Sequence, residues 1–376
     1  MKVLIFADNL GNNAPGFVFH NLVRGLSQKI EFDVVTATPG MGVDIKGQQF
    51  FVKPIRRWPS KIIKSIFILF GVHITQYLWA KRSQKYIREK DYDVVISLMS
   101  YSFYASLMAA NMYCSVHNAK HICYCVDAVP APSPWEKDGI FKKAIKRFVQ
   151  SNFKRVNLLA MTNKEMLAYE LSIIASKHID GMVVPNPPLY SHLISLEDEV
   201  DMPSFVYAGK IYGLREPDAL VSGFDLFLEK YPTSKLYIVG SNMNKDDFQK
   251  MGCANIDNYV FVDYTRDLIP IFNKCVGLID INANIDNDVF LSSKILSYLP
   301  YNRLIISESG ANSPVRSMFA SSSTILHIKH NPNEYFNAFE YCYKNYTSID
   351  FSEREEYLAR FNMDAVADLL ISKFVI

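Results

Sequence analysis

The stretch Ser204-Phe205-Val206-Tyr207-Ala208-Gly209-Lys210 decides the fold, because a second series of alternating strands and helices begins there. Apolar and aromatic residues followed by glycine are typical of a short buried strand that ends in a turn. Further strands are predicted at 236–239, 260–262, 276–281 and 304–307, and helices at 215–231, 266–274 and 292–299. Such alternation predicts a parallel sheet covered by helices on both faces.

The residues before this stretch show the same alternation. Strands are predicted at 3–7, 34–36, 94–97, 122–126 and 158–161, and helices at 17–28, 101–111 and 163–176. A chain of 376 residues also exceeds what a single core usually supports. We therefore predict two open α/β sheets in two domains, with ligands outside the carboxyl ends of the strands.

Prolines and acidic residues mark the predicted border between the domains. Pro185-Asn186-Pro187-Pro188 cannot continue a helix or a central strand, and residues 189–203 are polar and acidic. A long amphipathic helical pattern runs from Phe351 to Phe374. The predicted division is therefore a domain at 1–188, a linker at 189–203, a domain at 204–350 and a helix within 351–376.

Composition excludes several classes of protein. Hydrophobic residues make up 49% of the chain and charged residues 21%, which is ordinary for a globular protein and argues against disorder. The six cysteines show no zinc-type spacing, so we expect reduced thiols in a cytoplasmic protein and no metal. The amino terminus lacks the long apolar region of a signal peptide. The longest apolar stretch, 66–80, is shorter than the roughly 20 residues of a membrane span.

Charge is unevenly distributed although the net charge is only +2. Residues 41–90 contain eleven Lys or Arg and two acids, for a local charge of +9, and residues 142–155 form a second basic cluster. Within 56–90 the basic residues are interleaved with Trp58, Phe67, Phe70, Tyr77 and Trp79. We predict that 56–90 and 142–155 contact an anionic membrane surface, on its cytoplasmic inner face, and not nucleic acid. The alternative is a core helix with solvated ends.

The segment 280–307 contains the strongest candidate for a phosphate site. Ser292-Ser293-Lys294 opens a predicted helix, where free amides and the helix dipole favour an anion. Lys294 adds an ammonium group and Ser293 a hydroxyl donor. The alternative is a helix-capping serine beside a solvated lysine.

This segment resembles the P-S-K-L-x-E-Y-L-A-x-G-K-P-V region of GT-B glycosyltransferases, especially glycosyltransferase family 4. In that family the lysine contacts the donor diphosphate. Other parts resemble the family at matching spacing. Residues 205–210 resemble the opening of its second domain, and Arg215 resembles its second basic phosphate contact. Residues 236–240 resemble its L-x-I-V-G strand, and 183–187 resemble its V-I-P-N-P hinge.

The resemblance implies two Rossmann-like domains that face a central cleft. The first would bind the acceptor and the second the nucleotide sugar, and the final helix would cross back onto the first domain. The implied nucleotide-sugar site consists of Gly209, Lys210, Arg215, Gly240, Ser293, Lys294 and Ser297. The sequence departs from the family where its helix glutamate falls on Ser297, and where Arg303-Leu304 replaces its K-P pair.

The loop Asp8–Gly16 follows the first predicted strand and resembles the family's glycine-containing loop near the phosphates and the acceptor. The implied contacts are Gly11, Asn12, Gly16 and His20. The loop lacks the G-x-G-x-x-G pattern, so no dinucleotide cofactor is predicted. An ordinary strand–helix turn with a packed histidine is the alternative.

Asp127 is the predicted general base. It follows the strand 122–126, at a strand end where the family often has an aspartate or histidine near the acceptor hydroxyl. The alternative is an aspartate that caps the proline-rich turn after it. His117 and His121 precede the strand and are expected at the surface.

Together these features predict a glycosyltransferase that moves a hexose from a UDP- or GDP-sugar to a saccharide or lipid-linked acceptor in surface polysaccharide biosynthesis. The resemblance implies retention of anomeric configuration, no essential metal and no cofactor beyond the nucleotide sugar. A sugar-nucleotide epimerase of the same fold is one alternative. A catalytically degenerate binding or scaffold subunit is another, and Ser297 favours it.

Overall fold

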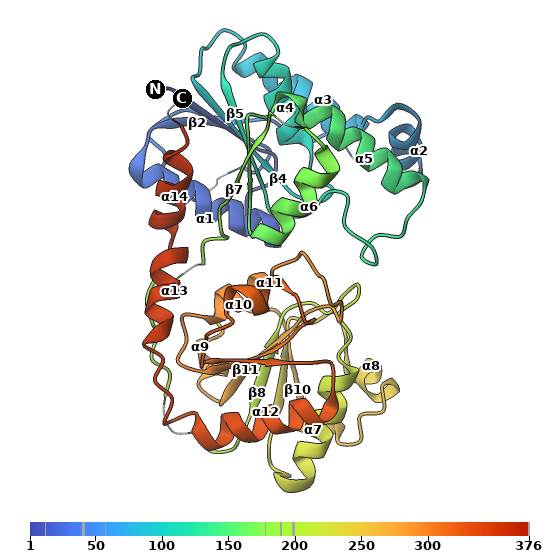
Figure 1. Cartoon of the computed structure of the whole chain (residues 1–376), viewed down its shortest axis with the longest axis vertical. Coiled ribbons are helices and arrows are strands. Elements are labelled where there is room, and N and C mark those ends of the chain that lie inside the picture. Colours follow the sequence, from blue (N-terminus) through green and yellow to red (C-terminus); the bar gives the residue numbers. More distant parts are fainter. Residues whose placement is uncertain are drawn as a thin grey trace. The chain divides into compact units, whose positions relative to one another are not determined.

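The computed structural model describes residues 1–11, 13–39, 42–56, 58–176, 178–188, 190–197 and 200–374. The chain divides into two units, and each is built around its own parallel sheet (Figure 1). The N-terminal unit comprises Met1–Leu189 and Phe361–Ile376, and the C-terminal unit comprises Tyr190–Arg360. Residues of the predicted linker belong to the second unit, where Ile194 pairs with Tyr301. Asp198 and Glu199 lie outside the described residues.

The sheet of the N-terminal unit has seven parallel strands in the order β3-β2-β1-β4-β5-β6-β7. The strands are β1 (Val3–Ala7), β2 (Phe32–Thr36), β3 (Gln49–Phe51), β4 (Val94–Met99), β5 (Lys120–Cys125), β6 (Leu158–Met161) and β7 (Asp180–Val183). Every residue of β1 and β4 is buried, as expected for central strands covered on both faces.

The helices of this unit are α1 (Ala14–Lys29), α2 (Ser60–Phe70), α3 (Ile74–Ser83), α4 (Ala105–Cys114), α5 (Ile140–Asn152), α6 (Lys164–Ile174) and α14 (Met363–Ile371). Short 3-10 helices, η1 (Gln84–Tyr86) and η2 (Phe153–Arg155), follow α3 and α5. Asparagine side chains start α1 and α6, because Asn13 accepts a hydrogen bond from Gly16 and Asn163 one from Met166.

The sheet of the C-terminal unit has six parallel strands in the order β10-β9-β8-β11-β12-β13. The strands are β8 (Phe205–Ala208), β9 (Leu236–Val239), β10 (Tyr259–Val262), β11 (Gly277–Ile281), β12 (Leu304–Glu308) and β13 (Ile325–Ile328). The helices are α7 (Asp218–Lys230), α8 (Lys245–Lys250), α9 (Ile269–Phe272), α10 (Ser293–Tyr298), α11 (Pro314–Met318), α12 (Pro332–Asn345) and α13 (Glu353–Phe361), with a 3-10 helix η3 (Ile256–Asn258). The predicted pair of parallel α/β sheets is thereby confirmed.

The final helical pattern forms two helices where one was predicted. Asn362 separates α13 from α14, and its side chain caps α14 by accepting a hydrogen bond from the amide of Ala365 at 2.7 Å. Val366 and Leu370 of α14 pack into the core of the N-terminal unit. There α14 lies beside α1 (Figure 1), and a Cβ on Gly25 of α1 would come within 2.6 Å of the carbonyl oxygen of Met363. Glycine therefore permits the close approach that brings the C-terminal helix onto the N-terminal unit, as predicted.

Two arginines are buried in the C-terminal unit. Arg303 precedes β12, and its guanidinium group donates to the carbonyl oxygens of Cys275, Asn302 and Glu197. Arg354 donates to the carbonyl oxygens of Arg303 and Thr324. Arg303 and Thr324 directly precede β12 and β13, so these contacts lie at the amino edge of the sheet, away from the carboxyl edge. Arg303 is consequently a structural residue, although its spacing from Lys294 resembled that of a family site motif.

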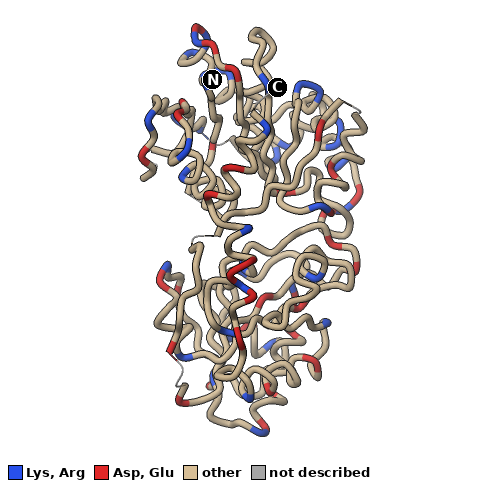
Figure 2. The backbone as a smooth tube through the Cα atoms, turned by 60° about the vertical axis from the view of Figure 1, so that its left-hand side comes forward, with Lys and Arg blue, Asp and Glu red and all other residues tan. Residues whose placement is uncertain are grey.

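The predicted membrane-facing segment is partly buried. Phe67 and Trp79 are only 2% and 3% exposed, because α2 and α3 pack onto the unit and the indole of Trp79 donates to the Val52 carbonyl. Helices α2 and α3 carry two basic residues each and α5 carries four, while the other described basic residues of the two clusters lie on neighbouring loops, turns and 3-10 helices; Figure 2 marks the charged residues along the backbone. Arg57 lies outside the described residues. In the described chain no helix alone is long and apolar enough to span a bilayer. The helical segments Ser60–Phe70 and Ile74–Tyr86, which are bent by 80° relative to each other, would together have the length and apolar composition of a span.

Candidate functional site

Lys294 lies directly across the end of strand β8. Gly209, which follows the strand, has a φ of 125°, and a Cβ there would lie 2.6 Å from Cε of Lys294. The ammonium nitrogen of Lys294 is 4.8 Å from the centre of the Tyr207 ring. Both the backbone conformation and the space above it therefore require glycine at this position. Two residues 85 positions apart in sequence numbering, Gly209 and Lys294, thus form one feature of the carboxyl edge.

Arg215 brings a second positive charge to Lys294. The pKa of Lys294 is lowered to about 8, first by burial and then by the nearby charge of Arg215, while Asp280 opposes the shift. Nε of Arg215 is buried and has no hydrogen-bond partner among the described residues. Neither side chain forms an ion pair with a described residue. Two cations in a partly dehydrated setting favour an anion, and a diphosphate has the charge and the acceptor oxygens to meet both.

Asp280 fixes the start of α10 beneath Lys294. It is fully buried at the end of β11, and its two oxygens accept hydrogen bonds from Ser292 at 2.7 Å and Asn282 at 2.8 Å. Ser292 in turn caps α10 by accepting from the amide of Lys294. Because α10 has only six residues, the charge of Lys294 must supply more of the positive potential than the predicted helix dipole.

The other predicted donor-site residues surround this centre less closely. Ser293 and Ser297 are exposed, and the Ser297 hydroxyl donates to the Ser293 carbonyl at 3.0 Å. Lys210 is exposed, and its carbonyl accepts a hydrogen bond from Tyr207. Gly240 directly follows β9 and has a φ of 62°. The structure therefore brings Gly209 and Lys294 into contact, with the charge of Arg215 near the lysine. The side chain or backbone of Lys210, Gly240 and Ser297 contacts other residues, namely Tyr207, Tyr264 and Ser293.

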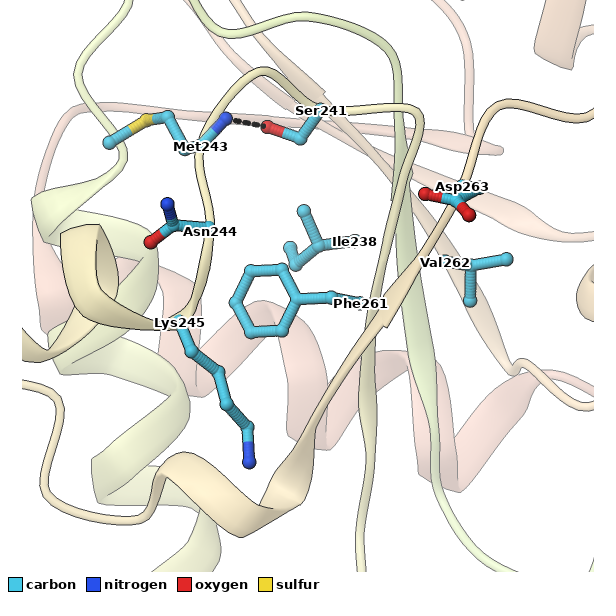
Figure 3. A pocket seen from close by; sticks show the side chains of 8 residues that line it. All are labelled: Ile238, Ser241, Met243, Asn244, Lys245, Phe261, Val262 and Asp263. Atoms are coloured by element: carbon cyan, nitrogen blue, oxygen red, sulfur yellow. Dashed lines mark hydrogen bonds between the residues drawn. The ribbon is translucent and has the colours of Figure 1, made fainter.

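A pocket of about 440 Å³ lies at the carboxyl ends of β9 and β10 (Figure 3). It is lined by Ile238, Ser241, Met243, Asn244, Lys245, Phe261, Val262 and Asp263. A hydrogen bond from the Ile211 amide to Asn242 joins the loop after β8 to the loop beside this pocket. Polar groups at a strand-end pocket of this size are typical of a small-molecule site.

Two exposed tyrosines on these loops were not predicted from the sequence. Tyr264 is 70% exposed, and its side chain would lie 3.4 Å from a Cβ at Gly240. Tyr212 is 56% exposed, and the Arg215 guanidinium lies 4.7 Å from its ring centre. Exposed rings of this kind can stack on a nucleobase. Their position on loops gave no periodic signal in the sequence.

The buried Glu308, at the end of β12, pairs with the part-buried His330. Glu308 accepts hydrogen bonds from Nδ1 of His330 at 2.9 Å and from the Tyr335 hydroxyl at 2.7 Å, and Nε2 of His330 faces Asp218. The hydrogen bond that His330 donates to Glu308 is the main reason why the pKa of His330 rises to about 9. Among the described residues, Glu216, Asp218 and His330 have ligand atoms within 4.8 Å of one another. Both ring nitrogens of His330 already face carboxylates, those of Glu308 and Asp218, so we assign this group to hydrogen bonding.

In the N-terminal unit, Asp127 lies where the sequence predicted it, just after β5. One carboxylate oxygen accepts a hydrogen bond from the Tyr101 amide at 2.9 Å, and burial raises the pKa of the carboxyl group. Asp8 follows β1 and accepts from the Ser106 hydroxyl at 2.6 Å, and burial raises its pKa to about 6. Because β4 lies between β1 and β5, the two carboxylates flank the end of one strand.

The glycines of the first loop have structural roles. Gly11 has a φ of 77°, and a Cβ on Gly16 would lie 2.9 Å from both the Asn9 side chain and the Gly11 amide nitrogen. These contacts support the alternative of a tightly packed strand–helix turn. His20 is part-buried on α1, and Asn12 lies outside the described residues.

His121 is not at the surface, contrary to the prediction. Strand β5 already begins at Lys120, so His121 is fully buried and forms a 2.9 Å hydrogen bond with the Ser97 hydroxyl. Burial lowers its pKa to about 3. His117 is part-buried and stacks on Tyr113 with ring centres 4.2 Å apart.

Comparison with known proteins shows similarity in structure alone. No family model matches the chain, and no curated protein matches it in sequence. Anabaena HepE, solved in complex with UDP and glucose, superposes with a TM-score of 0.67 over 98% of each chain at 10% identity. The lipopolysaccharide outer core galactosyltransferase WaaB gives a TM-score of 0.62 over 99% of this chain and 98% of its own at 13% identity.

A third similar structure is a TarM variant from S. aureus in complex with Fondaparinux, alpha-GlcNAc-glycerol and UDP. It gives a TM-score of 0.69 over 100% of both chains at 11% identity. At such low identity these structures define the fold, which is the GT-B fold of glycosyltransferases, and the reaction has to be argued from the residues.

Proposed function

We propose that the protein transfers a hexose from a nucleotide diphosphate sugar, a UDP- or GDP-sugar, to a saccharide or lipid-linked acceptor in surface polysaccharide biosynthesis. The observation that carries the proposal is a pair of cations, Lys294 in contact with Gly209 and Arg215 near enough for its charge to act on the lysine, neither of which forms an ion pair with a described residue. The fold shared with glycosyltransferases, some of them solved with UDP, supports the same choice of ligand.

The chemistry of these residues suits departure of a diphosphate. As the bond between the anomeric carbon and the diphosphate oxygen breaks, negative charge accumulates on the leaving oxygen. Lys294 and Arg215 would stabilise that charge, so we propose that the reaction needs no metal. The acceptor oxygen forms the new bond to the anomeric carbon, with retention of configuration, and its proton passes to a carboxylate.

Asp127 is the proposed proton acceptor. It lies at a strand end, its carboxylate is held by the Tyr101 amide, and burial raises its pKa toward the range in which a carboxylate can exchange protons near neutral pH. We further propose that Tyr212, Tyr264 and the pocket beside Asn244 serve the nucleoside part of the donor.

We place this reaction in the cytoplasm, at the inner face of the membrane. Helix α2 exposes Leu69 by 73% and Phe70 by 71%, and the adjacent α5 carries four basic residues in its first turns. Exposed apolar residues beside basic ones are typical of helices that bind anionic bilayers. Co-sedimentation with anionic vesicles at low salt tests this, and absence of binding would contradict it. Phe70→Glu should weaken binding, whereas Val116→Glu, at a similarly exposed apolar residue, should not.

One observation favours a second candidate function, a sugar-nucleotide-binding subunit without transferase activity. Ser297 stands where the related family has a glutamate, and its hydroxyl is occupied by the Ser293 carbonyl. The two functions differ in turnover and not in binding. A screen of UDP- and GDP-sugars, with release of nucleotide diphosphate measured beside calorimetric binding, separates them. Binding without release in the presence of any acceptor preparation would favour the subunit.

A further inference from the structure

A second cavity, of about 270 Å³, lies in the N-terminal unit between α2, the start of α3, the β4–α4 loop and α5. Its walls include the apolar or aromatic side chains of Ile63, Phe67, Tyr104 and Phe141. The polar residues Ser60, Lys64, His73 and Ser102 also line it. The cavity is therefore mostly apolar, with a few polar groups on its border.

The apolar wall is held in place by ring packing. The Phe67 ring centre lies 5.8 Å from that of Phe141, 6.4 Å from that of Tyr104 and 5.5 Å from that of Phe148. Phe67 is only 2% exposed, so it anchors α2 to the unit. A fixed apolar cavity of this kind accepts hydrocarbon more readily than water or sugar hydroxyls.

This cavity adjoins the residue that we propose as the base. Ser102 lines the cavity, and the amide of the preceding Tyr101 donates to Asp127. Gln76 fixes the loop from the other side, since it donates to the Ser102 carbonyl and accepts from the Tyr104 amide, both at 2.6 Å. Ser102 itself has a φ of 68°. One constrained loop thus connects the cavity to the Asp127 carboxylate.

Helix α2 is apolar on more than one side. Ile63 and Phe67 face the cavity, while Ile62, Leu69 and Phe70 are 47%, 73% and 71% exposed. A helix that is apolar all round is normally covered by an apolar medium. The chain therefore presents hydrocarbon-compatible surface on both the cavity side and the outer side of one helix.

Positive charge accompanies these apolar surfaces. The Lys64 ammonium lies 4.5 Å from the centre of the Phe141 ring. Burial raises the pKa of Glu136, which accepts a hydrogen bond from the Tyr101 hydroxyl, and the charge of Lys64 is among the effects that oppose this shift. On the nearby α5, Lys143, Lys146 and Arg147 border a shallow surface that also includes Ile140, which is 68% exposed. A ligand that suits both features has a hydrocarbon chain and an anionic group.

From this arrangement we infer that the cavity receives the hydrocarbon segment nearest the head group of an anionic lipid-linked acceptor, with its phosphate at Lys64 and its reactive end toward Asp127. The inference rests on the proposed function for the reaction that follows. It narrows the acceptor from a saccharide or lipid-linked molecule to molecules in which a phosphate is joined to a hydrocarbon chain.

Calorimetric titration of the full chain with alkyl phosphates tests the inference, using decyl and butyl phosphate below their micelle-forming concentrations. We expect one saturable site whose affinity rises about fourfold for each added methylene, until the cavity is filled. Ile63→Glu should lower decyl phosphate affinity at least tenfold, because it places a charge in the cavity. Ile62→Glu, the neighbouring residue on the exposed side of the same helix, is the matched control and should retain binding.

Two further variants separate charge from chain burial. Ile63→Trp fills the cavity without adding a charge, so it should also abolish the dependence on chain length, and it replaces Ile63→Glu if that variant does not fold. Lys64→Gln should weaken decyl phosphate about three- to tenfold and leave decyl maltoside unchanged. Circular dichroism confirms the fold of each variant.

Several results would overturn the inference. Equal affinities for butyl and decyl phosphate would indicate an anion site alone, and equal losses in the two glutamate variants would indicate partition onto the outer face of α2. UDP is titrated into the same samples. UDP binding without alkyl phosphate binding would refute the cavity assignment and leave the proposed function, whereas the reverse would refute the donor site and leave the cavity.

Discussion

At the carboxyl edge of the C-terminal sheet, Lys294 and Arg215 hold two positive charges close together, whereas carboxylates occupy the corresponding edge of the N-terminal sheet. Burial lowers the pKa of Lys294 and raises those of Asp8 and Asp127. Glu170, which accepts from the Val129 amide beyond β5, has a pKa raised to about 8 and an oxygen without a partner in the described chain. Both edges therefore keep ionisable groups in settings that disfavour their charge.

Under the proposed function, the two edges would have different tasks in the reaction. The cationic edge can accept a diphosphate and stabilise its departure, while the carboxylate edge can take a proton from an incoming hydroxyl. If this division is correct, changes at one edge should alter binding and changes at the other should alter turnover. The following experiments test that separation, beginning with the largest expected effect.

Asp127→Asn should lower turnover by roughly 10²–10⁴-fold and leave UDP affinity nearly unchanged. The amide still accepts the hydrogen bond from Tyr101, so the loop should keep its shape, but the group can no longer take a proton. Steady-state release of nucleotide diphosphate and calorimetric UDP titration give the two values. Glu136→Gln, beside the same tyrosine, is the control and should reduce turnover much less. Full activity of Asp127→Asn would limit Asp127 to shaping the turn.

Lys294→Ala should weaken UDP or GDP binding by roughly 10–150-fold, with little effect on uridine or guanosine. A hydrogen bond to a charged group contributes about 1.5–3 kcal/mol, which corresponds to this range. The free energy of unfolding should change by no more than about 0.5 kcal/mol, because the lysine has no ion-pair partner in the described chain to lose. Lys210→Ala, at an exposed lysine of the adjacent loop, is the matched control. Equal diphosphate affinities in parent and Lys294→Ala would leave the phosphate to Arg215.

Much of the fold could be predicted because buried parallel strands are continuous apolar runs, as in β1 and β8. The contact between Gly209 and Lys294 could be suggested only by resemblance, since it depends on how strands pair. His121 was misplaced because a polar residue at the start of a buried strand gives no apolar signal. The break at Asn362 was missed because the amphipathic pattern continues while the helix changes the core it covers.

Some limits of sequence interpretation lie in the chemistry of single side chains. The sequence does not show whether an arginine contacts a ligand or backbone carbonyl groups. Arg303 donates to backbone carbonyls, whereas Arg215 has a buried nitrogen without a hydrogen-bond partner in the described chain. Tyr212 and Tyr264 lie on loops, where exposure depends on tertiary packing. Ser297 could be recognised as a departure from the family, but its hydrogen bond to the Ser293 carbonyl depends on how the helix folds.

UDP affinity should fall by up to about tenfold between pH 7 and pH 9. Lys294 has a pKa of about 8 in the free protein, and only its protonated form attracts the diphosphate. UDP binding should raise this pKa, so binding near pH 8 should be accompanied by proton uptake. Titrations in buffers of different ionisation enthalpy measure that uptake. Lys294→Met should bind more weakly at pH 7 and lose most of the pH dependence; a variant that keeps the full dependence would assign it to another group.

The smallest expected effect concerns Glu308, a buried carboxylate at the carboxyl edge of the C-terminal sheet, which is paired with the cationic His330. His330 has a pKa raised from 6.5 to about 9 by Glu308 and, to a lesser degree, by Asp218. Because the folded-state pKa is above the unfolded value, this pair stabilises the fold fully below pH 6.5, and the contribution disappears as pH rises through 9. Burial also raises the pKa of Glu308, which acts in the same direction at lower pH. The parent Tm should therefore fall more than that of His330→Gln between pH 7 and pH 9.5, by about 2–4 °C. UDP affinity should be the same in both proteins, because Glu308 and His330 neutralise each other's charge. A loss of UDP binding in His330→Gln would extend the donor site to β12, and would show that charges paired within the protein also act on the ligand.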